Sequence, residues 1–181
     1  MKALSLLAST VLGATLLTAI AVGADAPDAL EEHLEALRPF VGRTWRGEFK
    51  NSRPDRPMID IARWERALNG KAVRVLHSIN DGFYGGESLI VWDKEKAEIR
   101  YHYFSTGGFH TVGTMTVTNG IITAVEKVFG SKEGVTEVRS TYELRPDGTL
   151  LNSAEYLKGD QVTSTREVLY REDPKAEVKF K

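Results

Sequence analysis

The chain contains no cysteine among its 181 residues. Without thiols it forms no disulfides, no thiolate zinc site and no cysteine nucleophile, so three kinds of site are excluded at once. A lipid anchor attached through cysteine is excluded by the same absence. The fold must therefore be held by packing and hydrogen bonding instead of by cross-links.

The chain also lacks an excess of charge of either sign, because 24 basic and 25 acidic side chains give a formal net charge of -1. Basic and acidic residues alternate along the sequence instead of clustering. Binding to nucleic acid depends largely on a basic surface that neutralises phosphates. The composition therefore argues against a nucleic-acid partner.

The one long hydrophobic run is at the start, MKALSLLASTVLGATLLTAIAVGA. A single charge at Lys2, an apolar stretch and small terminal residues are typical of an export signal. We expect residues 1–24 to be cleaved after Ala24, which leaves residues 25–181 as one domain. An uncleaved membrane anchor is the alternative, because about 20 apolar residues can span a bilayer. Cleavage predicts a periplasmic or secreted protein with no stable membrane insertion.

Two periodicities follow the leader. Leu30, Leu34 and Leu37 recur at helical spacing between Pro27 and Pro39, which predicts one short amphipathic helix. From Trp45 onward the period is two, and turn residues such as Asn-Gly and Asp-Gly recur often enough to delimit about ten strands. These strands are expected near residues 45–50, 58–68, 71–80, 84–92, 97–104, 109–118, 121–129, 135–144, 149–157 and 161–171.

The expected fold class is all-β, an antiparallel up-and-down barrel of about ten strands with one short N-terminal helix, because closure removes the exposed edges of a long meander. A membrane barrel would need an apolar face toward lipid on every strand. Residues 135–144 instead place Glu137, Arg139 and Glu143 on one face. We therefore expect a water-exposed outer face and a packed inner face.

Turn geometry assigns the inner face. A two-residue turn at Asn69-Gly70 pairs Trp64 with Val75 and Ala62 with His77. Three-residue turns at 146–148 and 158–160 predict three further pairs, Tyr142 with Asn152, Tyr156 with Val162, and Asn152 with Arg166. The resulting candidate ligand-binding residues on the inner face are Trp64, His77, Tyr142, Asn152, Tyr156, Arg166 and Tyr170.

The motif VGRTWRGEF after a helix, with a meander that ends in REVLYRED, resembles the calycin group of barrels. That group includes lipocalins, fatty-acid-binding proteins, nitrobindin-like domains and bacterial exported lipocalin-like domains of unknown function. The resemblance implies that Trp45 packs across the closed end of the barrel. It also implies that a C-terminal arginine, Arg171 first and Arg166 second, lies over the indole, while Gly42 and Gly47 allow the bend and the close approach.

The sequence departs from each of these relatives. Two residues separate Gly42 from Trp45 where lipocalins have one, and residues 51–57 are too short for the lid helices of fatty-acid-binding proteins. Nitrobindin-like domains bind haem through a histidine in the C-terminal part of the barrel, and this chain has no histidine after His110. The haem site of nitrobindin-like domains is therefore not inferred for this chain, and we expect no cofactor.

Arginine and histidine on an apolar inner face are the chemically informative residues. Arg166 needs an anionic or strongly polar partner there, which a ligand carboxylate or an internal pair with Asp60 would supply. His77 is either a structural hydrogen-bonding group or the base of an enzyme. His102 and His110 flank one hairpin. A loop at 105–108 sends their imidazoles to opposite faces, whereas a three-residue loop would bring them together, and in either case a metal site lacks a clear third ligand.

The leading hypothesis is an exported soluble barrel that binds a small amphipathic or apolar molecule in its interior. The alternatives are a structural or partner-binding barrel with a filled core, and a small-molecule isomerase or hydrolase that uses His77. No catalytic residue and no metal ligand is assigned, and homodimerisation through an outer face stays open. A cavity larger than about 300 Å³ would favour ligand binding over a filled core.

Overall fold

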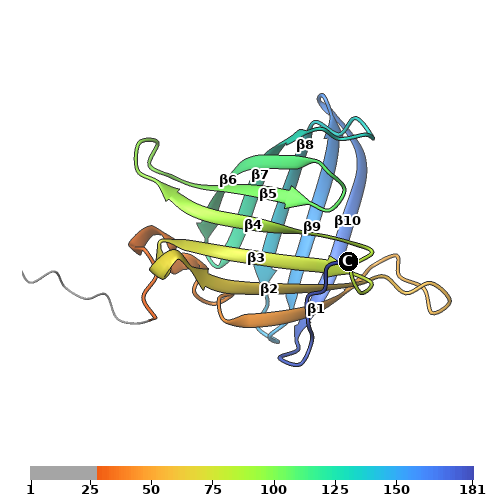
Figure 1. The fold of residues 1–181 in the computed structure, drawn as a ribbon, viewed down its shortest axis with the longest axis horizontal. Coiled ribbons are helices and arrows are strands. Elements are labelled where there is room, and N and C mark those ends of the chain that lie inside the picture. Colours follow the sequence, from red (N-terminus) through yellow and green to blue (C-terminus); the bar gives the residue numbers. More distant parts are fainter. Residues whose placement is uncertain (1–27) are drawn as a thin grey trace, which may run out of the picture.

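The structure is a computed structural model of the protein, and it describes residues 28–181. The expected leader and Pro27 lie outside the described residues. Ten antiparallel strands close into a barrel in which consecutive strands pair and β1 pairs with β10 (Figure 1). The predicted all-β up-and-down barrel is confirmed.

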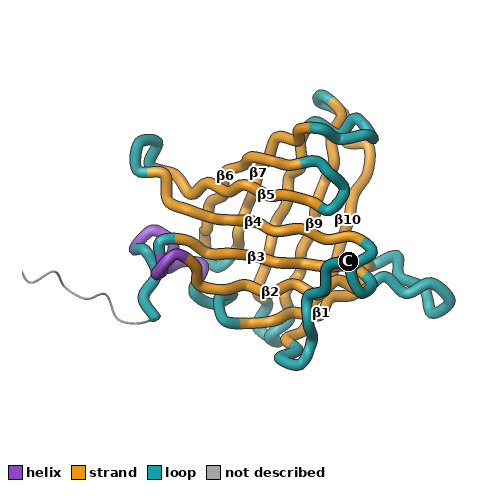
Figure 2. The backbone as a smooth tube through the Cα atoms, in the orientation of Figure 1, coloured by secondary structure: helices purple, strands orange, loops and turns teal. Residues whose placement is uncertain are grey.

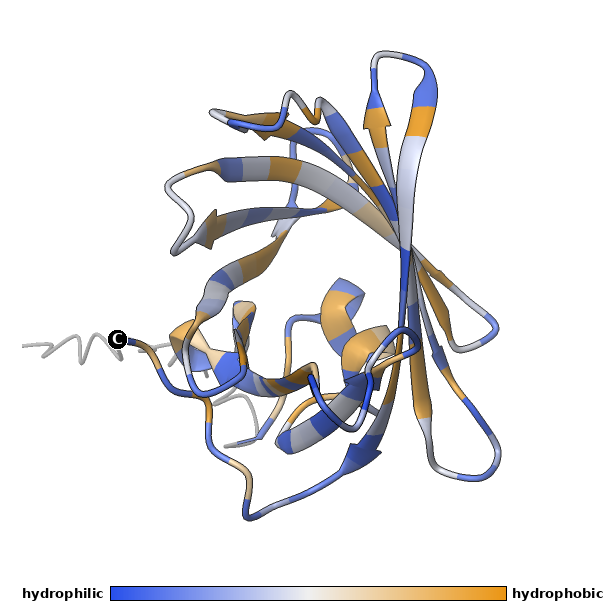
Figure 3. Ribbon diagram, turned by 90° about the vertical axis from the view of Figure 1, so that its right-hand side faces the viewer, coloured by the Kyte–Doolittle hydropathy of each residue, from blue (hydrophilic) through white to orange (hydrophobic). Residues whose placement is uncertain are grey.

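The strands follow the expected boundaries within a few residues. Their bounds are β1 Arg43–Phe49, β2 Ile59–Ala67, β3 Ala72–Ile79, β4 Tyr84–Asp93, β5 Glu98–Ser105, β6 His110–Thr118, β7 Ile121–Phe129, β8 Glu137–Leu144, β9 Leu150–Lys158 and β10 Gln161–Glu172. Hydrophobic and hydrophilic residues alternate along many of these strands (Figure 3). This alternation separates a packed interior from a polar outer face.

The predicted N-terminal helix is a short 3-10 helix, η1 (Glu32–Leu37), and a second 3-10 turn, η2 (Leu68–Gly70), connects β2 to β3. Both lie at the end of the barrel opposite the C-terminus (Figure 2). Leu34 and Leu37 of η1 are fully buried together with Phe40. Their side chains therefore fill one end of the barrel, which we call the closed end.

Trp45 lies in this closed end and is completely buried, as expected. The predicted cation over its ring is wrong, because the guanidinium 5.7 Å from the ring centroid belongs to Arg43. Arg171 is exposed on β10, and Arg166 lies instead over the rings of Phe49 and Tyr156. Arg43 precedes Trp45 by two residues, so the cation comes from the same face of the same strand.

The register at the Asn69-Gly70 turn is confirmed, with Trp64 opposite Val75 and Ala62 opposite His77. The pairing of Tyr142 with Asn152 is confirmed as well. The turn residue Asn69 has a φ of 55°, and Gly70 has a φ of 86°. Both angles suit the two central positions of a tight hairpin.

The predicted register of the last hairpin is wrong by two residues. Arg166 pairs with Ala154 instead of Asn152, and Tyr156 pairs with Ser164 instead of Val162. A tight turn between Lys158 and Gln161 followed by an irregularity between Val162 and Ser164 causes the shift. Because the shift is an even number of residues, Arg166 still faces inward, whereas Val162 is exposed.

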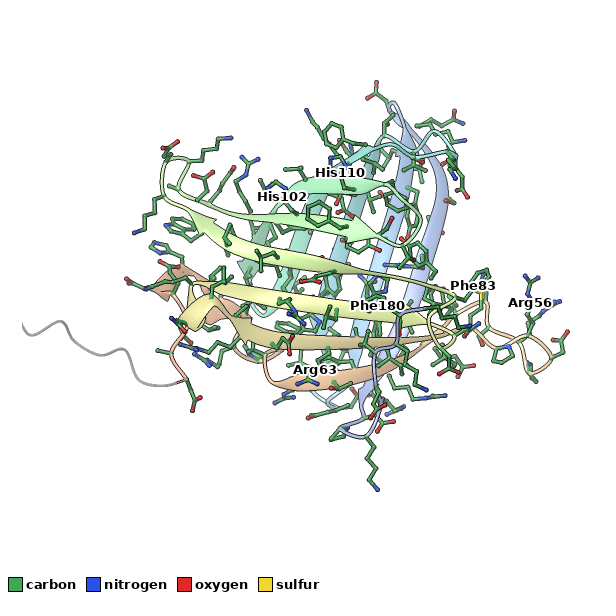
Figure 4. The ribbon with its side chains drawn as sticks, viewed as in Figure 1. Arg56, Arg63, Phe83, His102, His110 and Phe180 are labelled. Carbon is green, nitrogen blue, oxygen red and sulfur yellow. The ribbon has the colours of Figure 1, made fainter. Side chains whose placement is uncertain are left out.

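The loop at 105–108, which would send His102 and His110 to opposite faces, is wrong, and the alternative with both imidazoles on one face is the one that forms. His102 pairs with Val112, and His110 pairs with Phe104, so both imidazoles lie on the outer face and are exposed (Figure 4). His110 stacks between Phe104 and Phe129, with ring centroids 6.1 Å and 5.1 Å away. The Ser105 N–H donates to the carbonyl of Phe109 at 3.1 Å, so three residues, 106–108, close the hairpin, and this shorter loop brings the two imidazoles to one face.

The C-terminal residues return along the outside of the barrel to the end opposite η1. The backbone N–H of Lys179 donates to Ser78 Oγ at 3.0 Å, and its ammonium lies 2.9 Å from Asp81. Phe180 is half exposed at the same end as Phe83, which is largely exposed (Figure 4). The C-terminal segment thus fixes the turn between β3 and β4 at what we call the open end.

Candidate ligand-binding site

A cavity of about 560 Å³ occupies the interior of the barrel. Its deep wall is apolar and includes Trp64, Ile90 and Met115, near the closed end. The lining also includes Phe109 and Lys132, from the loops that follow β5 and β7. Those loops lie at the open end, so the cavity extends from the middle of the barrel toward this end.

All candidate ligand-binding residues from the sequence line this cavity. They are Trp64, His77, Tyr142, Asn152, Tyr156, Arg166 and Tyr170. They come from five strands far apart in the chain, which closure of the barrel brings to one space. The alternation of inward and outward side chains was therefore sufficient to predict their location.

A continuous chain of hydrogen bonds joins the titratable groups on one side of the cavity. The Tyr170 hydroxyl donates to Asp60 Oδ2 at 2.6 Å, and His77 Nδ1 lies 3.1 Å from Asp60 Oδ1. His77 Nε2 lies 2.9 Å from the hydroxyl of Tyr103. That hydroxyl is in turn 2.9 Å from the hydroxyl of Tyr84. Five side chains thus form one hydrogen-bonded network.

Glycines in the strands make room for the aromatic rings of this network. A Cβ at Gly47 would lie 2.4 Å from Tyr170 Cδ1, and a Cβ at Gly86 would lie 2.3 Å from Tyr103 Cε2. Gly47 on β1 pairs with Tyr170 on one side and with Asp60 on the other. The Tyr170 ring therefore lies over Gly47 and reaches the Asp60 carboxylate on the far side of β1. Gly86 likewise pairs with His77, the residue that Tyr103 contacts. Each glycine therefore permits one hydrogen bond between strands that are not adjacent.

Glu126 forms a second polar position, on β7. Its carboxylate accepts hydrogen bonds from Thr111 and Tyr101, and Tyr101 lies over Gly113 in the same way. Burial raises the pKa of Glu126 above its usual 4.5 and outweighs these hydrogen bonds, which lower it. Burial at this position therefore shifts the carboxyl toward its protonated form relative to an exposed glutamate.

Arg166 has no carboxylate partner among residues 28–181. One terminal nitrogen donates to Asn152 Oδ1 at 2.7 Å, while its Nε is buried without a hydrogen-bond partner. The alternative of an internal pair with Asp60 does not form, because Asp60 is bonded to Tyr170 and His77. Arg166 thus presents to the cavity wall a guanidinium that is held by Asn152 and by the rings of Phe49 and Tyr156, without a carboxylate ion pair among the described residues.

The tyrosines of the cavity are neutral hydrogen-bonding groups. Burial raises the pKa of Tyr142 to about 12, and burial also raises the pKa of Tyr84, Tyr101, Tyr103 and Tyr170. Their phenols therefore keep their protons near neutral pH and can donate them to a bound oxygen.

A wider hollow of about 890 Å³ lies between the end of β1 and strands β8 to β10. It is lined mainly by polar side chains and contains Arg166 but none of the tyrosines. The interior cavity holds the hydrogen-bonded network and the apolar wall, so we take it as the candidate site. Within residues 28–181 no three metal-ligating side chains converge, and no helix there is long and apolar enough to cross a membrane.

Several cavity residues were missed by sequence reasoning. They are Tyr84, Tyr101, Tyr103, Thr111 and Glu126, with Asp60 considered only as a partner of Arg166. Gly86 and Gly113 lie inside strands, where glycine often marks a close approach of another side chain. This signal could have indicated that aromatic residues of a nearby strand occupy the space beside each glycine.

Comparison with known proteins gives the fold and no more. No protein-family model matches the sequence, and no curated protein matches it. Among solved structures, the crystal structure of Rv2717c from M. tuberculosis is similar, with a TM-score of 0.58 and 18% identity, over 80% of this chain and 99% of that one. At this identity the likeness supports a shared closed β-barrel architecture for the two chains.

Proposed function

We propose that the barrel binds a small amphipathic molecule in its interior, with an anionic group of the ligand at Arg166. The observation that carries the proposal is the guanidinium of Arg166, which faces a cavity of about 560 Å³ without a carboxylate partner among the described residues. A charge held away from water is costly unless it is paired. A ligand carboxylate would supply the missing partner through charge-assisted hydrogen bonds.

The distribution of apolar surface supports an orientation for the ligand. Phe109, Val128, Val135 and Val138 line the cavity toward the open end, while Arg166 and Asn152 lie deeper. A molecule that enters with its polar group first would leave its apolar part against these side chains. The cavity exceeds the roughly 300 Å³ at the lower limit of ligand pockets, which favours binding over a filled core.

The proposal also covers the class of barrel and the compartment in which the protein acts. We infer a calycin-like barrel, because Trp45 is buried at the closed end of an up-and-down meander. We also infer export to the periplasm or the medium, because residues 1–24 have the pattern of a signal peptide.

Homodimerisation is proposed through the exposed aromatic stack of Phe104, His110 and Phe129 on the outer face. Sedimentation of wild type and His110→Asp tests the dimer.

The experiment for binding combines native mass spectrometry of the purified protein with displacement of 8-anilinonaphthalene-1-sulfonate by medium-chain carboxylates. Arg166→Gln should weaken carboxylate binding by about 10- to 100-fold, since a hydrogen bond to a charged group contributes about 1.5–3 kcal/mol. Arg171→Gln is the matched control, because Arg171 lies on the same strand and is exposed. Equal carboxylate affinity in both variants, or no binding by wild type, would overturn the proposal.

A further inference from the structure

The network of Asp60, His77, Tyr103 and Tyr84 is arranged as a proton-transfer chain that ends in the cavity. We propose that the barrel catalyses keto–enol tautomerisation of small carboxylic acids that carry an enolisable carbonyl. The inference rests on the proposed binding of an anionic group at Arg166 and adds an activity to it. The proposal is based on three successive hydrogen bonds, from Asp60 to His77 at 3.1 Å, from His77 to Tyr103 at 2.9 Å, and from Tyr103 to Tyr84 at 2.9 Å.

The direction of the chain follows from Asp60. Its carboxylate can only accept hydrogen bonds, so it holds the proton of His77 on Nδ1 and leaves Nε2 with a lone pair. Nε2 then accepts from Tyr103, whose oxygen is free to accept from Tyr84. Tyr84 lines the cavity, and its oxygen, which also interacts with the Ser105 side chain, is the group that we assign to contact with a bound molecule. A proton taken up at Tyr84 therefore has a defined route to His77.

This arrangement resembles that of catalytic groups that a neighbouring base activates. The group that faces the substrate lies within hydrogen-bond reach of a base, and the base is oriented by a third group. Burial raises the pKa of Tyr103, so a free phenolate is not its resting state. Transfer of the proton onward to His77 lets the phenols act without ever holding a full negative charge.

The reaction consumes nothing but the substrate. The C–H bond beside the carbonyl breaks, its proton passes to the Tyr84 oxygen, and each phenolic proton moves one position toward His77 Nε2. The electron pair of that bond forms a C=C bond, while the π electrons of C=O move onto oxygen and give an enolate. The imidazolium, stabilised by Asp60, returns the proton through the same chain to the enolate oxygen. The keto acid has then become its enol.

Arg166 and the network lie on different strands that face the same space. Arg166 is on β10, whereas His77, Tyr84 and Tyr103 are on β3, β4 and β5, and all four line the cavity. A substrate held by its carboxylate at Arg166 would present its carbonyl region to the phenols across the cavity. Fixing both groups of one molecule is what positions the C–H bond for proton transfer.

The test measures exchange of the methylene protons of phenylpyruvate and 2-oxohexanoate for deuterium by proton NMR in D₂O. Wild type should accelerate the exchange over buffer. Tyr103→Phe and His77→Gln should slow it by about 10²- to 10⁴-fold, the usual contribution of general acid–base catalysis. His102→Gln is the matched control, because this histidine lies on the outer face.

Binding of the two probes is followed in parallel by displacement of 8-anilinonaphthalene-1-sulfonate, and it should persist in Tyr103→Phe. If the probes displace the fluorophore but exchange stays at the buffer rate, or is equal in wild type and Tyr103→Phe, the catalytic proposal is overturned and the binding proposal stands. If neither probe displaces the fluorophore, both proposals are overturned.

Discussion

Replacement of Gly47 by alanine tests the reason why this barrel carries glycines inside its strands. In an ordinary strand interior, glycine is less stable than alanine by about 0.5–1 kcal/mol, so the replacement would normally stabilise the protein. At Gly47 the added Cβ would lie 2.4 Å from Tyr170 Cδ1 and 2.5 Å from Val168 Cγ1. We therefore expect the opposite sign.

The magnitude follows from two costs. Forcing an extra methyl group into a packed interior costs about 1–3 kcal/mol. Displacing the Tyr170 ring also breaks its hydrogen bond to Asp60 and leaves a buried group unsatisfied, at about 1–3 kcal/mol. With the ordinary gain for alanine subtracted, the net loss is about 1–5.5 kcal/mol. For a chain of this size that corresponds to a fall in Tm of about 2–22 °C.

Thermal and urea unfolding of Gly47→Ala, Tyr170→Leu and the double variant measure this effect. Without the Tyr170 ring, the cost of Gly47→Ala should drop by about 0.5–3 kcal/mol, the range for residues in contact. Gly107→Ala is the control, because its Cβ would meet nothing closer than 3.4 Å. A neutral or stabilising Gly47→Ala, or strictly additive energies in the cycle, would refute the steric reasoning.

Three other predictions address the closed end and the polar cavity. Trp45→Ala should lower the free energy of unfolding in urea by about 3–5 kcal/mol, and a negligible change would show that this indole does not seal the barrel. Since burial raises the pKa of Glu126 above its unfolded value of 4.5, the folded state binds the extra proton, and wild-type stability falls as pH rises above that value. Glu126→Gln removes this fall, so its Tm should exceed that of wild type near neutral pH and converge with it in acid. Arg166→Met should leave the Tm of the ligand-free protein unchanged or higher, because an apolar replacement of a buried charge is neutral or stabilising by about 1–4 kcal/mol; a large fall would reveal an internal anionic partner.

Much of the architecture could be predicted because it depends on local signals. Period-two alternation and turn residues define strands one at a time, and closure follows from their number. At Asn69-Gly70 the predicted register was right because the turn is tight and the strands beyond it are regular. At the last hairpin it was wrong because the irregularity after Val162 leaves no mark in the residue pattern.

Some of the residues that line the cavity could be predicted from the sequence, and the contacts among them could be predicted only in part. The inward position of His77 and Arg166 follows from alternation alone, and both line the cavity. The contact between His77 and Tyr103 depends on the opening at Gly86, which joins strands that are not adjacent. The register between neighbouring strands does not predict a contact that crosses an intervening strand, as this one does. The cation over Trp45 was assigned to Arg171 by analogy, whereas Arg43 on the same strand was nearer.

The two halves of the interior show that the polar network is not required for closing the barrel. The closed end is filled by Leu34, Leu37, Phe40 and Trp45, so the chain seals one end with apolar side chains. Beyond this apolar filling, the inner face that lines the cavity carries an arginine, a histidine, two carboxyl groups and a set of phenols. Each such group costs free energy when it is removed from water, and Arg166 lacks full compensation. A barrel selected only for stability would continue the apolar filling, so the polar half supports the proposal that a small molecule binds there.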